Sequence, residues 1–381
     1  MRGVDVLVVG AGPAGLMAGL TLSRAGVSVV ILEKRERPDL PVACGEAVSR
    51  WFFERFNFSP RSSWVKATVS RLEMIMPGGG MFYATYPGYS LDRRAFEAHL
   101  VAEYQEAGGI LNRGDSFLDA SRKGKGWEVT TSQGKWKVAV LLGCDGPRSR
   151  VASSLGWRKR QWLLAIQYKF PFNPYPGNAL RFYYTSDLPR GYLYLFPRGD
   201  EMTVGVGGLR KGSYLRGYLE GFLEKEGIDP SRKVCSVAGL IPLQPLLWPP
   251  GGEGCLLCGD AAGFVHPMTK GGIHLACYSG EAAARALLST DVEKWGGEEP
   301  LKRYMAFLRD VNSLRPSWYT DNVDLSLLPD PVLEEVGRAM DQKPYFALPV
   351  VGFLKRPRLF PWIPRLLRIQ WRYRSSCRWG W

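Results

Sequence analysis

The first residues with the types and spacing for chemistry form the run Gly10-Ala11-Gly12-Pro13-Ala14-Gly15. An apolar segment, Val4–Val9, precedes this run, and small and apolar residues at helical spacing follow it. Gly10 permits a tight turn, Gly12 lets a pyrophosphate approach the backbone, and Gly15 lets a helix pack closely on a sheet. The free N–H groups where that helix begins can bind phosphate. The run therefore predicts a phosphate-binding turn between a strand and a helix.

A second apolar segment, Val27–Arg35, contains an acid near its end, Glu33, which Lys34 follows, and we expect both residues to contact the cofactor. Glu33 lies about 20 residues beyond the glycine run, where a carboxylate can accept hydrogen bonds from a ribose hydroxyl. Strand, glycine turn, helix, strand and acid together predict a Rossmann-like unit that binds a dinucleotide. This unit alone does not distinguish FAD from NAD.

Two later segments repeat the pattern of an apolar strand that ends in a glycine-and-aspartate turn. They are LLGCDGPRSRV, at 141–151, and CLLCGDAAGFVHPMTKGGI, at 255–273. With the N-terminal glycine run they resemble the three FAD fingerprints of the flavoprotein group that holds aromatic hydroxylases and geranylgeranyl reductases. The resemblance implies FAD as the cofactor, and the contacts that it implies in the two later segments are Asp145, Gly259 and Asp260.

The residue types of the third segment agree with that resemblance. Asp260 ends a strand beside a glycine-rich helix start, so its carboxylate could bind a ribityl hydroxyl or simply cap a helix. Gly271, Gly272 and Ile273 begin the next helix, and their N–H groups could face the polar edge of a flavin. The dipole of this helix would favour the anionic reduced flavin.

Three segments resemble the geranylgeranyl reductase branch in particular. Cys44-Gly45 resembles the Cys-Gly segment that prenyl reductases place beside the flavin ring. SLDRRAFEAHL, at 90–100, resembles their Asp-Arg-x-x-Phe helix start, where Asp92 would cap the helix. The alignment implies Arg93 as a cofactor contact. GYLYLFPRGDEMTVGVG, at 191–207, resembles their Tyr-x-Trp-x-Phe-Pro motif, with Tyr194 where the family usually has Trp. The chain is thus identified as a member of the FAD-dependent geranylgeranyl reductase family.

The segment at 191–207 also makes physical sense as a substrate-binding strand. Tyr192, Tyr194 and Phe196 fall on one strand face at period two, and Pro197 begins the turn that follows. Such a face could line a cavity for a prenyl chain or an aromatic ring, or it could pack on the protein's own core. We therefore predict that Tyr192, Tyr194, Phe196 and Pro197 bind substrate.

The resemblance implies an enzyme that reduces C=C double bonds of geranylgeranyl or polyprenyl lipids by hydride transfer from reduced flavin. Cys44, Tyr192 or a flavin-bound water could supply the proton. Cys44 could equally be a small buried hydrophobe or a thiol that only lines the flavin pocket. Two alternative functions remain, an aromatic monooxygenase and a flavin-binding electron-transfer protein. Since the sequence has no second GxGxxG in a strand–helix setting, NADPH or reduced ferredoxin would act as an external electron donor.

The composition narrows the class of protein. The chain has 381 residues, of which 45% are hydrophobic and 23% charged, which excludes disordered and fibrous architectures. Its seven cysteines are an odd number and fit a reducing cytosol. Cys255-x-x-Cys258 lies in an apolar strand without zinc-site spacing to a histidine, so we expect no metal. With no apolar stretch of about 18 residues and no signal peptide, we expect a cytoplasmic protein.

The C-terminal tail is strongly basic within a chain whose net charge is +14. From Lys343 onward it has nine Lys and Arg and no Asp or Glu, interleaved with Trp362, Trp371, Trp379 and Trp381. This pattern favours the cytoplasmic face of an anionic membrane, although a helix packed on the body would also fit. No nucleic-acid-binding motif accompanies the positive charge, so we expect no nucleic-acid partner.

These observations predict an α/β fold. A Rossmann-like FAD-binding domain would contain an inserted antiparallel β-sheet substrate domain, and a helical C-terminal region would follow. We expect the FAD-binding domain at 1–75, 98–160 and 235–300. The substrate-binding domain would occupy 76–97 and 161–234, and the helical region with the basic, aromatic tail would occupy 301–381.

Overall fold

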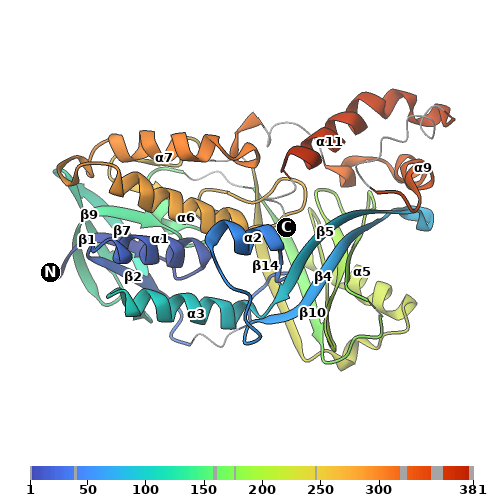
Figure 1. The fold of residues 1–381 in the computed structure, drawn as a ribbon, viewed down its shortest axis with the longest axis horizontal. Helices are drawn as coiled ribbons and strands as arrows, with labels where there is room; N and C mark the ends of the chain where they lie inside the picture. The colour runs from blue at the N-terminus through green and yellow to red at the C-terminus, as the bar shows by residue number, and fades with distance from the viewer. Residues whose placement is uncertain are drawn as a thin grey trace.

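Two eight-stranded sheets form the two halves of the molecule and lie side by side along its long axis (Figure 1). The computed structural model describes residues 2–37, 41–157, 161–175, 177–244, 247–317, 324–344 and 355–376. Long helices lie on the first sheet, and the C-terminal helices lie on the second half (Figure 1). The predicted fold class is confirmed: a Rossmann-like half, a second sheet and a helical C-terminal region.

The first sheet contains the apolar segments that we assigned to strands. Its central strand β1 (Arg2–Val9) pairs in parallel with β2 (Val29–Glu33) on one side and β9 (Gly134–Gly143) on the other. All three are largely apolar because parallel strands are covered on both faces. The strand order is β15-β16-β9-β1-β2-β6, and β7 and β8 extend β9 as antiparallel strands. The remaining strands are β6 (Ile110–Arg113), β7 (Phe117–Lys123), β8 (Gly126–Thr131), β15 (Gly251–Gly252) and β16 (Cys255–Leu257).

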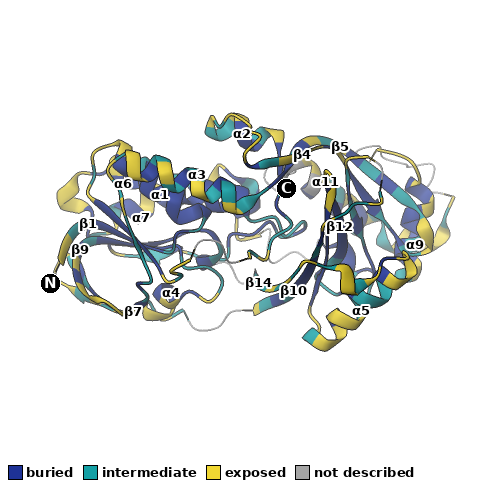
Figure 2. Cartoon of the chain, turned by 90° about the horizontal axis from the view of Figure 1, so that it is seen from below, coloured by how far each residue is buried: buried dark blue, intermediate teal, exposed yellow. Residues whose placement is uncertain are grey.

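Helices cover one face of the first sheet (Figure 2). α1 (Pro13–Arg24) follows β1 directly and packs against α6 (Ile273–Leu288). The two helices approach so closely that a Cβ atom on Gly280 would lie 2.0 Å from the carbonyl oxygen of Ala14. This contact packs the middle of α6 against the first turn of α1. The other helices of this half are α2 (Arg50–Phe56), α3 (Arg93–Glu106), α4 (Arg150–Ser154) and α7 (Glu299–Arg309).

The second sheet has the order β14-β10-β13-β12-β11-β4-β5-β3. Neighbouring strands are antiparallel, as predicted, except that β11 and β4 run parallel. The strands are β3 (Ala47–Ser49), β4 (Val65–Ile75), β5 (Met81–Leu91), β10 (Gln161–Phe170), β11 (Ala179–Tyr183), β12 (Tyr192–Arg198), β13 (Glu201–Gly208) and β14 (Cys235–Gln244).

Helices cover both faces of the second sheet. On one face, α5 (Gly212–Lys225) packs through Leu215, Leu219 and Leu223, which recur every four residues. On the other face, α9 (Asp330–Met340) and α11 (Ile363–Ser376) share an apolar core with side chains of β4, β5, β11 and β12. This second core also contains Tyr194 and Phe196, so the C-terminal helices and the predicted substrate strand belong to one layer.

Two strands pair in a different sheet from the one that the expected domain boundaries imply. β4 and β14 lie in the second sheet, whereas the division from the sequence placed 65–75 and 235–244 with the FAD-binding domain. β14 is an edge strand that pairs with β10, far earlier in the sequence, so its apolar pattern could not indicate which sheet it joins. β4 pairs with the distant β11 and also with the next strand, β5, so the expected boundary at 75 divides a hairpin. We propose that the substrate domain includes both strands.

Within the described ranges, no helix is both long and apolar enough to cross a bilayer. Trp379 and Trp381 lie outside the described residues, as do 345–354 of the basic tail.

Candidate functional site

A cavity of about 860 Å³ is lined by both halves of the molecule. Residues from the glycine turn, the two aspartate turns, the Cys44 loop and strand β12 all line it, although they are far apart in sequence. Only Gly15 and Pro197, among the residues that we predicted, do not. The predicted residues that line the cavity are Gly10, Gly12, Pro13, Ala14, Glu33, Lys34, Cys44, Gly45, Arg93, Asp145, Tyr192, Tyr194, Phe196, Gly259, Asp260, Gly271, Gly272 and Ile273.

The turn before α1 requires its glycines for steric reasons. Gly10 has a φ of +104°, and a Cβ atom there would lie 2.4 Å from the carbonyl oxygen of Cys144. A Cβ atom on Gly15 would lie 1.9 Å from the carbonyl oxygen of Gly10, so Gly15 acts by packing the helix onto the turn rather than by lining the cavity. A Cβ atom on Gly12 would meet no atom within 4 Å, so the backbone at this position is open to the cavity.

Glu33 stabilises this turn from the end of β2. Its Oε2 accepts a hydrogen bond from the N–H of Ala11 at 3.1 Å. Its Oε1 accepts from the backbone N–H and the Nε–H of Arg35, at 2.9 and 3.0 Å. Burial raises the pKa of Glu33, but the contacts with Arg35 and Ala11 outweigh it, so the pKa lies below its ordinary value. Glu33 therefore remains a carboxylate beside the cavity, and its proposed contact with a ribose stays a prediction.

Asp145 follows β9 and caps the short helix α4. Its Oδ2 accepts hydrogen bonds from the N–H groups of Arg150 and Val151, at 2.6 and 3.2 Å. Its Oδ1 is buried and has no hydrogen-bond partner among the described residues. A buried carboxylate oxygen without a partner is costly unless a ligand donates to it.

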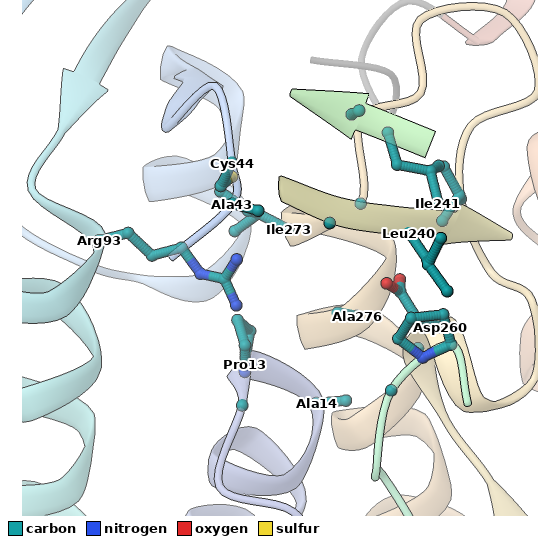
Figure 3. A pocket seen from close by; sticks show the side chains of 18 of the residues that line it. Pro13, Ala14, Ala43, Cys44, Arg93, Leu240, Ile241, Asp260, Ile273 and Ala276 are labelled. Carbon is teal, nitrogen blue, oxygen red and sulfur yellow. The ribbon is translucent and has the colours of Figure 1, made fainter. Parts of the chain in front are cut away.

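Asp260 and Arg93 reach the cavity from opposite sides. Figure 3 shows the Arg93 guanidinium and the Asp260 carboxylate pointing into the same space, above the start of α1 at Pro13 and Ala14. Burial raises the pKa of Asp260 to about 6, and the positive charge of Arg93 opposes that shift. Nε and Nη2 of Arg93 each lie 2.8 Å from Oε1 of Glu97, which holds the guanidinium in place. Asp92 caps α3 as the sequence predicted, accepting from the N–H groups of Arg94 and Ala95.

The lining of this half of the cavity suits a dinucleotide. Neither α1 nor α6 has a side-chain cap, so the N–H groups of their first turns are available where Gly12 and Gly272 line the cavity. Gly12 leaves room for a pyrophosphate, and Asp145 offers an unpartnered acceptor for a hydroxyl. The residues present therefore fit FAD. No group of three or more His, Cys, Asp or Glu in the described part of the chain is arranged to hold a metal ion.

The Cys44 loop joins the two halves of the cavity. The N–H of Glu46 donates a hydrogen bond to Sγ of Cys44 at 3.3 Å, and the positive charge of the Arg93 guanidinium interacts electrostatically with the Cys44 side chain. Gly45 lies against the ring of Phe196, because a Cβ atom there would come within 2.7 Å of it. The loop is fixed by Glu46, whose buried carboxylate contacts Lys169 at 2.5 Å and Arg198 at 2.6 Å.

Aromatic side chains of β12 and β11 form the apolar wall of the cavity. The ring centroid of Phe182 lies 5.2 Å from that of Tyr192 and 5.1 Å from that of Phe196, in edge-to-face contacts. Tyr194 packs on Phe196 with ring centroids 4.6 Å apart. Pro197 does not line the cavity, because successive residues of a strand point to opposite faces and Phe196 occupies the cavity side. We therefore no longer assign Pro197 to the substrate-binding wall.

Both tyrosine hydroxyls on this wall have protein partners. Tyr192 donates a hydrogen bond to the carbonyl oxygen of Thr269. Tyr194 donates to Oε1 of Gln167 at 2.8 Å, and burial, together with the nearby Cys44 and Glu46, raises the pKa of its hydroxyl. Each of these two hydroxyls therefore already donates its proton to a protein oxygen.

Several polar residues of the cavity were missed from the sequence. Arg35 and Glu46 lie within two residues of predicted contacts, so their position in the sequence could have indicated them. Gln167 could not be found in that way, because only the pairing of β10 and β12 with opposite sides of β13 brings it to Tyr194. Lys270 adopts a positive φ of 58°, and its Nζ lies 2.8 Å from Oδ2 of Asp324, another pairing of distant segments.

Comparisons with known proteins agree with this geometry. The model of an FAD binding domain matches residues 3–42. Digeranylgeranylglycerophospholipid reductase 2 of Methanopyrus kandleri is 30% identical over 324 residues, which cover 79% of this chain and 81% of that protein. The chain belongs to the geranylgeranyl reductase family. It is therefore an FAD-dependent oxidoreductase.

Other relatives are consistent with this family. The digeranylgeranylglycerophospholipid reductase of Methanocaldococcus jannaschii is 29% identical over 321 residues, 79% of this chain and 81% of that protein. The crystal structure of a geranylgeranyl bacteriochlorophyll reductase-like protein from Thermoplasma acidophilum superposes with a TM-score of 0.83 at 24% identity, covering 96% of this chain and all of that one. PqsL of P. aeruginosa, solved with 2-aminobenzoylacetate, has a TM-score of 0.66 at 20% identity over 84% of this chain and 95% of its own. These two structures show that the chain shares their fold.

Proposed function

We propose that the protein reduces C=C double bonds in the geranylgeranyl or polyprenyl chains of an isoprenoid lipid. The observation that carries this proposal is the shared cavity: the dinucleotide-binding turns and the aromatic wall of β12 line one space of about 860 Å³. The M. kandleri and M. jannaschii relatives, both named digeranylgeranylglycerophospholipid reductases, support a lipid of this class.

The second half of the cavity suits a linear chain of isoprene units. Its lining combines the aromatic wall with aliphatic side chains of β10, β11 and β14, among them Ile166, Leu180 and Leu240. Such surfaces bind a prenyl chain by excluding water from it, and they offer few polar groups to a hydrophilic substrate. Water exclusion also favours transfer of a hydride to carbon over side reactions.

Reducing each double bond adds one hydride to one alkene carbon and one proton to the other. Bound, reduced FAD supplies the hydride. Sγ of Cys44 is the proton source that the contacts favour, because the thiolate left behind would be stabilised by Arg93 and by the N–H of Glu46. Tyr192 is the second choice, since its hydroxyl must first leave the carbonyl oxygen of Thr269.

Reducing equivalents must enter from outside. The sequence has no second dinucleotide-binding unit, so we propose that NADPH or reduced ferredoxin delivers electrons during a transient encounter. The basic tail and the lipid nature of the proposed substrate favour action on the cytoplasmic face of a membrane.

Mass spectrometry of the lipid product tests this function. Purified protein loaded with FAD is reduced with dithionite and mixed anaerobically with a detergent-dispersed digeranylgeranyl phospholipid. We expect the lipid to gain the mass of two hydrogen atoms for each double bond reduced. Unchanged lipid, together with oxygen consumption that depends on an aromatic compound, would instead support the monooxygenase. Bound FAD that turns over neither substrate would support an electron carrier.

A further inference from the structure

The last described segment of the chain is attached to the body by one face. It consists of a 3₁₀ turn, η7 (Pro357–Trp362), and helix α11. Leu359, Leu366 and Ile369 are buried in the apolar core that α11 shares with the second sheet. This packing fixes the orientation of the helix, so the opposite face is held toward the outside of the molecule (Figure 1).

The outward face carries large apolar side chains. Phe360 is 48% exposed, Leu367 43% and Trp371 62%. At about 100° per residue, Leu367 and Trp371 lie within about 40° of each other around the helix axis. Three large exposed apolar residues within 12 positions form a patch of the kind that marks an interaction surface.

Positive charges border these apolar side chains. Arg358, Arg368 and Arg374 are exposed, and the helical positions of Arg368 and Arg374 fall on either side of Leu367 and Trp371. The guanidinium carbon of Arg372 lies 5.4 Å from the Trp371 ring centroid. The chain from Lys343 to its end contains no acidic residue to offset them.

We propose that this outward face docks on the surface of an anionic phospholipid bilayer. We call it the α11 docking face and define it by Phe360, Leu367, Trp371, Arg358, Arg368 and Arg374. The helix would lie in the plane of the interface, with the apolar side chains among the acyl chains and the arginines at the phosphates. Trp is enriched at this depth of a membrane because its ring is amphipathic.

A lipid surface fits these residues better than other polyanions do. Nucleic acid would engage the arginines but would leave Leu367 and Phe360 in water. A bilayer satisfies both kinds of side chain at once, because charge and apolar depth are layered in it. The inference rests on the proposed function in one respect only, that the substrate is a lipid whose headgroup would lie at the same surface.

Flotation with vesicles tests the docking face without any catalytic readout. FAD-loaded full-length protein is mixed with vesicles of equal parts phosphatidylglycerol and phosphatidylcholine, or of phosphatidylcholine alone, at low and high salt. We expect binding to the anionic vesicles at least about tenfold stronger than to the zwitterionic ones, and weakened by salt. Equal binding to both vesicles, or none to either, would overturn the proposal.

Matched pairs of variants locate the contact. Leu367→Ser/Trp371→Ser removes apolar contacts, and its control is Leu209→Ser/Tyr214→Ser, which alters exposed side chains on another surface, including a ring that also lies beside an arginine. Arg368→Glu/Arg374→Glu reverses two charges, and its control with the same charge change is Lys211→Glu/Arg216→Glu, also exposed. We expect each docking-face variant to lose about tenfold or more in vesicle affinity, and each control to keep it.

Two further measurements separate the possible failures. Docking-face variants should retain reductase activity on detergent-dispersed lipid, since none of these residues lines the cavity. If wild-type protein binds anionic vesicles as expected but reduces no lipid, the function is wrong and the docking face stands. If the serine variant instead turns a self-associated protein into a monomer while vesicle binding is unchanged, a second copy of the chain covers this face and the proposal falls.

Discussion

Oε2 of Glu46 lies 2.6 Å from Nη1 of Arg198 in an ion pair that is almost fully buried. The same carboxylate oxygen contacts Nζ of Lys169, and Arg198 also donates to the carbonyl oxygen of Leu91. Glu46 belongs to the Cys44 loop, whereas Arg198 and Lys169 belong to β12 and β10. The pair therefore ties the loop beside the flavin-binding turns to the sheet that carries the aromatic wall.

Replacing Glu46 with Gln should destabilise the protein strongly. The variant leaves the buried Arg198 and the half-buried Lys169 without a counter-charge, and breaking a buried pair in this way costs about 3–5 kcal/mol. Urea denaturation of the FAD-loaded protein measures the change in the free energy of unfolding. Glu128→Gln, which breaks an exposed pair with Lys135, is the control and should cost less than about 1 kcal/mol. Similar costs for both variants would show that the buried cluster does not hold the two halves together.

Replacing Cys44 with Ala should lower kcat while FAD binding is retained. Loss of a positioned proton donor typically lowers the rate by about 100- to 10,000-fold. Tyr192→Phe should have the smaller effect, because its hydroxyl donates to Thr269 rather than into the cavity. The measurement is the initial rate of lipid reduction under anaerobic conditions. Cys235→Ala, a partly exposed cysteine that does not line the cavity, is the control. A larger effect of Tyr192→Phe would move the acid role to Tyr192.

Sequence patterns predicted the parts of the site that depend only on residues close together in the sequence. The glycine turn, the Asp92 cap and the alternation of Tyr192, Tyr194 and Phe196 each depend on neighbours in sequence, and the structure has them where they were expected. The same local reasoning was wrong for Pro197. Strand β12 continues through Pro197 and Arg198, and the turn begins only after Arg198.

Features that depend on distant partners could not be predicted. Gln167 reaches Tyr194 only across the register of three strands, and Lys270 meets Asp324 only through the packing of two segments that are far apart in sequence. The assignment of β14 to the second sheet has the same cause, because its partner β10 lies far earlier in the sequence. Apolar alternation identifies a strand, but its hydrogen-bonding partners are set by tertiary packing.

Replacing Gly12 with Ala should weaken FAD binding without harming the fold. A Cβ atom at Gly12 meets no protein atom within 4 Å, so the methyl group would project into space where the pyrophosphate is proposed to bind. We expect the FAD dissociation constant to rise at least about tenfold, which corresponds to about 1.4 kcal/mol. Titration of FAD-free protein by flavin fluorescence measures it. Gly217→Ala in α5 also meets no atom within 4 Å, and it should leave FAD affinity unchanged. Equal affinities for both variants would place the pyrophosphate elsewhere.

The raised pKa of Asp260 should make the stability of FAD-free protein depend on pH. Burial raises this pKa from 3.8 to about 6, so between these values the folded protein binds more protons at Asp260 than the unfolded chain does. The free energy of unfolding therefore receives a contribution from Asp260 that falls as pH rises through this window. Asp260→Asn lacks it, so the difference between wild type and variant should fall by up to about 3 kcal/mol across the window.

Urea denaturation at a series of pH values measures that difference, and a second variant checks its sign. The hydrogen bonds from Ser231 lower the pKa of the exposed Asp229, so this group stabilises the fold above its ordinary pKa and loses that contribution as pH falls. Asp229→Asn should therefore give a difference from wild type with the opposite slope. A difference for Asp260→Asn that stays flat or rises with pH would mean that water reaches its carboxylate, and that Asp260 is ionised in the FAD-free protein across this range.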